Sequence, residues 1–117
     1  MDVSYRETPD CLIVEMSGTW KLNDAKEQIE AVRDRATQLG ATRVLIDCRE
    51  LEPPKNTVTR FLTGEYIAEF WRHPIKVAAL ANQQTVNNKL AETVAYNRGA
   101  WFAVFLEEEK AMQWLME

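Results

Sequence analysis

The sequence is short of the residues that usually bring metals, cofactors and cross-links. Its 117 residues include two cysteines, one histidine, four glycines and four prolines. Cys11 and Cys48 form no CxxC motif, and a single histidine cannot complete a zinc site with them. We interpret both cysteines as small buried side chains, because free cysteine is among the most buried residue types. We expect no metal and no cofactor.

Long apolar runs and basic clusters are also missing. The longest apolar run, Ala100 to Leu106, is far below the roughly 20 residues that cross a membrane, and Met1 to Arg6 lacks the layout of a signal peptide. We therefore expect a cytoplasmic protein without a membrane span. The net charge is −4, with 14 Lys and Arg scattered among 18 Asp and Glu, so we expect no nucleic-acid binding.

The familiar catalytic motifs are absent. The chain contains no GxGxxG, GxxxxGK[ST] or GxSxG, and no nucleophile lies near its only histidine, His73. We expect His73 to lie at a helix C-terminus, and we predict no catalytic residues. An enzyme that uses Asp47, Arg49 and Asn82 is the least favoured hypothesis.

Hydrophobic periodicity predicts one α/β domain over residues 1–117, with the order ββαβαβαβα. An N-terminal antiparallel hairpin followed by parallel strands would form a mixed five-stranded sheet with about four helices. A thioredoxin-like fold is the alternative architecture. The strands are expected at 3–7, 11–16, 43–48, 75–81 and 101–105, and the helices at 23–39, 56–71, 85–97 and 107–115.

Several segments resemble the bacterial SpoIIAA-like family, which is related to the STAS fold (sulphate transporter and anti-sigma-factor antagonist). They are Gly18, the strand Val44 to Arg49 with its Asp-x-Arg ending, the strand Ile75 to Leu80, the helix end Asn97 to Gly99, and the acidic helix Glu108 to Leu115. The resemblance implies a non-catalytic module without an established biochemical activity. It would act through protein contacts or self-association.

The resemblance does not bring a phosphorylation switch with it. Anti-sigma-factor antagonists place a phosphorylated serine just after the central strand. Here the stretch from Asp47 to Thr57 contains no serine, and Thr57 follows a proline pair.

Polar residues are expected to gather at one rim of the sheet. The carboxyl ends of parallel strands share an edge, and helix N-termini open there with free N–H groups. This rim could bind a small polar or anionic ligand or a side chain of a partner. Alternatively, its residues are loop caps, with Asp47 capping backbone and Arg49 paired with Glu50 or Glu65. The rim residues are Asp47, Arg49, Glu50, Asn56, Thr57, Asn82 and Gln83.

The predicted second helix is apolar nearly all round, so it must be covered on more than one side. Either it lies deep in the protein, or its aromatic residues form an interface with a protein partner or a second copy, as in a homodimer. Gly64 in mid-helix would allow another backbone to approach closely. Glu65 would pair with Arg49 or Arg60, or lie at the margin. The candidate interface residues are Phe61, Tyr66, Ile67, Phe70 and Trp71.

A small apolar or amphipathic ligand between the sheet and this second helix is the alternative function. Relatives of the fold in the SEC14 group bind lipids, and the resemblance therefore lends this hypothesis some support. The short chain leaves little room for a large cavity.

Overall fold

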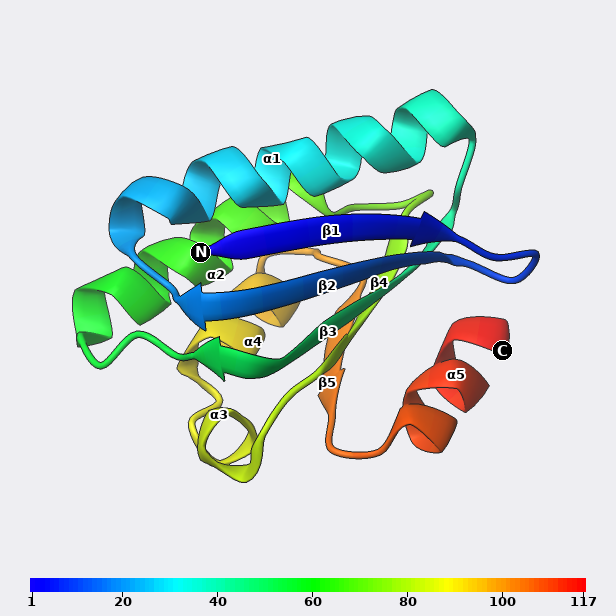
Figure 1. Cartoon of the computed structure of the whole chain (residues 1–117). Coiled ribbons are helices and arrows are strands. Elements are labelled where there is room, and N and C mark those ends of the chain that lie inside the picture. Colours follow the sequence, from blue (N-terminus) through cyan, green and yellow to red (C-terminus); the bar gives the residue numbers. More distant parts are fainter.

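A computed structural model describes the whole chain, residues 1–117, and its centre is a five-stranded sheet (Figure 1). The strand order β1-β2-β3-β4-β5 follows the sequence. β1 runs antiparallel to β2, and all other neighbours are parallel, so the expected mixed sheet is confirmed. The strands are β1 (Asp2–Glu7), β2 (Leu12–Thr19), β3 (Arg43–Glu52), β4 (Lys76–Leu80) and β5 (Phe102–Phe105).

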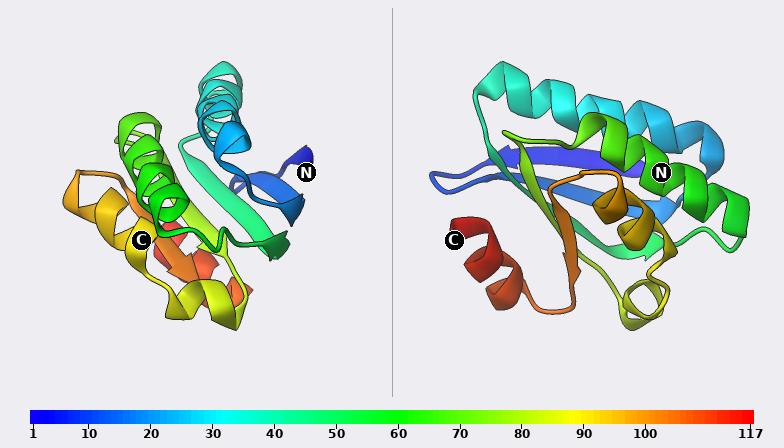
Figure 2. Two further views of the ribbon diagram at one scale, coloured as in Figure 1. Left: turned by 90° about the vertical axis from the view of Figure 1, so that its left-hand side faces the viewer. Right: turned by 180° about the vertical axis from the view of Figure 1, so that it is seen from behind.

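Helices pack on both faces of the sheet (Figure 2). Each parallel connection is expected to be right-handed, and each leads to the next strand on the same side, so the crossover helices fall on one face. They are α1 (Leu22–Leu39), α2 (Thr57–Phe70), α3 (Gln83–Asn87) and α4 (Leu90–Asn97), whereas α5 (Glu108–Met116) follows the last strand. No helix has both the length and the apolar character that crossing a membrane requires.

The two faces of the sheet bury separate clusters. Alternate strand residues such as Val14, Val44 and Val77 pack beneath α1, α2 and α4, together with Ile29 and other residues of these helices. On the opposite face the smaller cluster contains Leu45, Ala78 and Leu80 from the strands, Cys11 just before β2, and Ala111 and Leu115 from α5. Both faces of the central strands are therefore buried, as their continuous apolar runs predict.

Two details differ from the expectation. The third predicted helix is divided, because Asn88 adopts an extended conformation (φ −104°, ψ 94°) between α3 and α4. Asparagine favours such breaks, since its side chain competes for backbone hydrogen bonds. β3 also continues past Cys48 to Glu52, where it pairs with the end of β2 after a β-bulge opposite Glu15 and Ser17.

Two cations hold the C-terminal end of α5 against the sheet. Lys76 is buried, and its Nζ donates to the Trp114 carbonyl oxygen while lying 5.2 Å and 4.5 Å from the ring centroids of Trp101 and Trp114. Arg43 Nε donates to the Leu115 carbonyl oxygen over 3.1 Å. Positive charge suits this position, because the last carbonyl groups of a helix lack intrahelical partners and carry partial negative charge.

Candidate functional site

A cavity of about 320 Å³ lies between the sheet and the helices α2, α3 and α4. Its deep wall is formed by large apolar side chains that are almost fully buried. These are Met16, Trp20, Ile29, Ile46, Ile67, Trp71 and Phe102. The cavity opens toward the loop before α2 and the first turns of α3, where its lining residues are half-buried or exposed.

The polar atoms of the deep wall are already paired within the protein. Trp20 Nε1 donates to Thr63 Oγ1 over 3.0 Å, and Thr63 Oγ1 in turn donates to the carbonyl oxygen of Thr59 over 2.7 Å. Trp71 Nε1 donates to the carbonyl oxygen of Ile29 over 2.9 Å. The interior therefore presents an apolar surface, which suits a hydrocarbon or aromatic group rather than a polar one.

The mouth of the cavity carries a cation. Arg60 Nε donates to the carbonyl oxygen of Pro54 over 2.7 Å, which fixes the guanidinium beside the β3–α2 loop. With its amide oxygen turned toward Arg60, Asn88 accepts from Arg60 Nη1 over 2.7 Å. No carboxylate forms an ion pair with Arg60. Glu92, the one acid of the lining, accepts from the Val104 N–H over 3.0 Å.

Cys48 lines the cavity from β3. Its Sγ donates to the carbonyl oxygen of Leu80 over 3.0 Å. Burial, and to a lesser extent the nearby Asp47 carboxylate, raises the pKa of the Cys48 thiol to about 12. The thiol is therefore protonated at neutral pH and acts as part of the apolar wall. Cys11 lies in the other cluster, and both cysteines are free.

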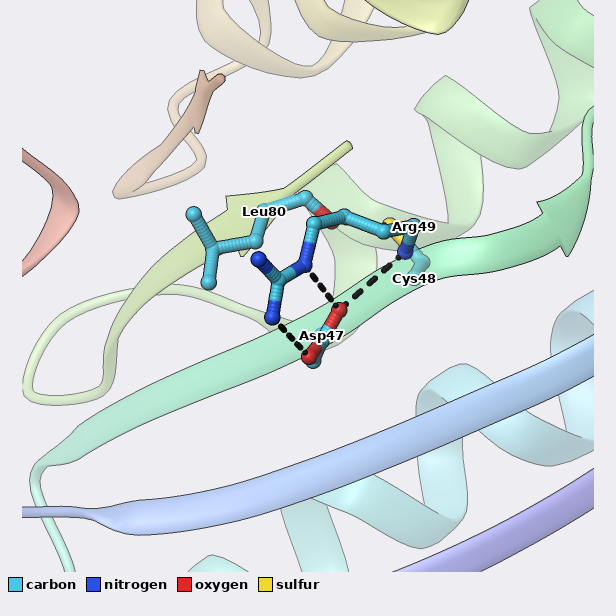
Figure 3. A network of polar contacts seen from close by, with 4 residues as sticks. All are labelled: Asp47, Cys48, Arg49 and Leu80. Carbon is cyan, nitrogen blue, oxygen red and sulfur yellow. Dashed lines mark hydrogen bonds and ion pairs between the residues drawn. The ribbon is translucent and has the colours of Figure 1, made fainter. Parts of the chain in front are cut away.

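Asp47 and Arg49 form an ion pair within β3, where the strand continues past the end of β4 (Figure 3). Arg49 Nη2 and Nε donate to the two Asp47 oxygens over 2.7 and 3.0 Å, and the Arg49 N–H donates to Asp47 Oδ1 over 3.2 Å. These bonds from Arg49 lower the pKa of Asp47. Asp47 is two residues after Leu45, so it points to the face that α5 covers, away from the cavity.

The other predicted rim residues stand mainly at helix starts. Asn56 caps α2 by accepting from the N–H groups of Val58 and Thr59, and Asn82 caps α3 by accepting from that of Thr85. The amide of Gln83 donates to Asn87 within α3. Glu50 and Thr57 are exposed. β4 and β5 do end side by side, because Leu80 is in register with Phe105, whereas β3 continues beyond Asp47, the partner of Leu80, to Glu52. A binding role for this rim stays a prediction.

The apolar residues of α2 divide between the interior and the surface. Ile67 and Trp71 are buried within the chain, whereas Tyr66 and Phe70 are half-buried. The outer face of α2 exposes Val58 (61%) and Phe61 (37%). Neither expected partner of Glu65 is correct, because Glu65 pairs over 2.8 Å with Arg98, the residue that follows α4. α4 lies beside α2 at this point and brings the cation within reach.

No motif in the sequence indicates that Arg60, Asn88 and Glu92 meet at the cavity. The available signal was the second helix, whose apolar residues on every side predicted cover from more than one direction. That cover comes from the sheet, α1 and α4. His73 follows the end of α2 and stacks on Trp101 with ring centroids 5.4 Å apart.

Comparison with known proteins identifies the fold. No family model and no curated protein matches the chain. Among solved structures, it is similar to an uncharacterized protein of the DUF3478 family with a SpoIIAA-like fold, from Shewanella loihica PV-4. The TM-score is 0.54 at 17% sequence identity, over 97% of this chain and 92% of the other. The chain therefore has a SpoIIAA-like fold, in agreement with the resemblance found in its sequence.

Proposed function

We propose that this SpoIIAA-like chain is a binding module for a small amphipathic molecule, with the apolar part held between the sheet and α2. The observation that carries the proposal is the apolar cavity of about 320 Å³. Ligand sites typically have volumes of about 300–1,000 Å³ and combine apolar walls with a few polar groups. This cavity lies at the lower end of that range, so a small ligand fits best.

The arrangement of charge supports a polar or anionic end on the ligand. Arg60 at the mouth forms no ion pair, and only part of its donor capacity is used by Pro54 and Asn88. An oxyanion at this position would gain charge-assisted hydrogen bonds, while the rest of the molecule replaces water along the apolar wall.

A pair of fluorescent probes tests this proposal. Anilinonaphthalene sulfonate is apolar with an anionic group, and N-phenylnaphthylamine is a neutral analogue. Both should bind with enhanced fluorescence. Ala91→Leu, which adds volume at the cavity lining, should weaken both at least about tenfold, whereas Ala31→Leu on α1, outside the lining, should not.

The charge at the mouth is tested separately. Arg60→Gln should weaken the anionic probe about fivefold or more and leave the neutral probe nearly unchanged, because only the former gains from the guanidinium. Arg72→Gln, two residues after the end of the same helix and outside the cavity lining, is the control. Failure of both probes to bind, or binding that Ala91→Leu does not alter, would contradict the proposal.

Self-association through α2, the first hypothesis from the sequence, is the second candidate. Val58 and Phe61 on its outer face support it, because exposed apolar side chains often mark contact surfaces. Sedimentation equilibrium of Phe61→Ser tests it. A concentration-dependent dimer that this substitution weakens would favour the α2 contact.

A further inference from the structure

The outer edge of β1 is a free sheet edge. β1 pairs only with β2, and Figures 1 and 2 show it at the end of the sheet, opposite β5. In an antiparallel pair, residues alternate between those that direct their N–H and C=O groups to the partner strand and those that direct them away. The Thr8 N–H donates to the Cys11 carbonyl oxygen over 3.0 Å, which fixes this alternation.

The register assigns each β1 residue to one side. Residues two, four and six positions before Thr8 share its direction, so Asp2, Ser4 and Arg6 bond toward β2. The backbone groups of Val3, Tyr5 and Glu7 therefore point away from the sheet. These three alternate residues leave a row of unpaired backbone N–H and C=O groups, which is a template for another strand.

The side chains of β1 make this edge complementary to itself. If two β1 strands pair antiparallel about a two-fold axis at Ser4, Val3 lies opposite Tyr5 of the second copy, with their outward backbone groups bonded. Asp2 then lies opposite Arg6, twice by symmetry. Shifting the pairing by two residues in either direction places Asp2 opposite Ser4 or Thr8 instead. Of these registers, only the one centred on Ser4 places the acidic Asp2 opposite the basic Arg6.

The two charged residues are available for such a contact. Asp2 and Arg6 are exposed and form no ion pair within the chain. They would occupy non-hydrogen-bonded positions of the new ladder, where opposing side chains lie closest. On the other face of the strand, Tyr5 is held beneath Arg35 of α1, whose guanidinium carbon is 4.5 Å from its ring centroid.

We propose that β1 is a dimerisation edge, at which the β1 strands of two copies of this chain pair antiparallel about Ser4 to form one continuous sheet. The Asp2–Arg6 pairs select the register, and the Val3–Tyr5 backbone bonds join the strands. A contact of one short strand buries little area, so the dimer is weak and depends on protein concentration.

Sedimentation equilibrium over a wide concentration range tests the backbone part. Val3→Pro removes an outward N–H without removing a bond to β2, and proline is tolerated at such edge positions. Val3→Ala is the matched control, because it loses the side chain and keeps the N–H. We expect Val3→Pro to weaken dimerisation at least about tenfold relative to Val3→Ala.

Charge reversal tests the register at exposed positions that should not affect folding. Arg6→Asp turns two attractions into two repulsions and should weaken the dimer about tenfold, and the double variant Asp2→Arg with Arg6→Asp should restore it to within about threefold. Added salt should reduce the difference.

Three results would overturn the proposal. The first is a chain that stays monomeric at millimolar concentration. The second is a double variant that dimerises no better than Arg6→Asp. The third is a dimer that Phe61→Ser abolishes and Val3→Pro leaves unchanged, which would move the contact to α2. Should Val3→Pro fail to fold, as urea denaturation would show, the charge series decides alone.

Discussion

At Gly64 the helix α2 packs closely against Ala91 and Val94 of α4, and the replacement of Gly64 by alanine tests this packing. A Cβ atom at this position would lie 2.6 Å from the Ala91 carbonyl oxygen and 2.8 Å from Val94 Cβ. Because ordinary contact begins near 3.4 Å, α4 would have to retreat by about 0.8 Å. The nearest atom belongs to the backbone, so no rotamer change relieves the contact.

We expect Gly64→Ala to lower the free energy of unfolding, although helix propensity alone favours alanine. Alanine is better than glycine inside a helix by about 1 kcal/mol, whereas overpacking costs about 1–3 kcal/mol. With a backbone atom in the way we expect the upper end of that cost, and hence a net loss of about 1–2 kcal/mol in the free energy of unfolding. For a chain of this length each 1 kcal/mol lowers Tm by about 4 °C.

Urea denaturation of Gly64→Ala and the parent protein measures this loss. The control compares Glu69→Ala with Glu69→Gly at an exposed position of the same helix. There the alanine variant should be more stable than the glycine variant by about 1 kcal/mol. A Gly64→Ala variant as stable as the parent would refute the reasoning, because it would mean that the two helices are not in close contact at this residue.

Cys48, Asp47 and Lys76 allow further tests. Cys48 should react with iodoacetamide at pH 8 about a thousandfold more slowly than a free thiol, since its thiol pKa is raised to about 12, and fast alkylation of the folded protein followed by mass spectrometry would contradict this. The same shift should lower stability as pH rises from about 9 toward about 12, where the unfolded thiol ionises before the folded one. Asp47→Asn should lower the free energy of unfolding by less than about 1 kcal/mol at pH 7, because the ion pair is partly exposed. This loss should shrink as the pH falls, because a lowered pKa of Asp47 contributes stability that protonation of the carboxylate removes; urea denaturation at neutral and at acidic pH measures the difference. Lys76→Met should lower the free energy of unfolding by about 2 kcal/mol, because it leaves the Trp114 carbonyl oxygen without its donor. It should also speed amide hydrogen exchange in α5 more than in α1. An equal increase in exchange in both helices would count against this role of Lys76.

Elements with strong periodicity could be predicted from the sequence. The spacing of apolar residues from Leu22 to Leu39 predicts one buried stripe on α1. Its four middle residues, Ala25, Ile29, Val32 and Ala36, are buried, whereas Leu22 and Leu39 at its ends are exposed. Gly40 ends that helix with φ 68°. Gly64 was also informative, because an unexplained glycine in mid-helix predicted the close approach that occurs. The break at Asn88 was missed, since its helix signal comes from residues on both sides of a single extended position.

The cavity could not be predicted in detail, because its lining comes from strands and helices far apart in the sequence. The rim prediction relied on the rule that ligands bind beyond the carboxyl ends of parallel strands, but such a crevice forms where the strand order reverses. In this sheet the order never reverses, so no crevice of that kind arises. Local pairing then uses most of the polar groups, as with Asn56 and Asn82 at their helix starts.

The strictly sequential strand order also affects how the chain folds. Every strand neighbours the one made just before it, so the sheet can grow outward from the β1–β2 hairpin without waiting for a distant segment to be inserted. Pairings that close short loops carry a low entropic cost and favour rapid folding. On the ribosome, each new β–α unit emerging from the tunnel would find its docking edge already in place, and α5 would seal the opposite face last.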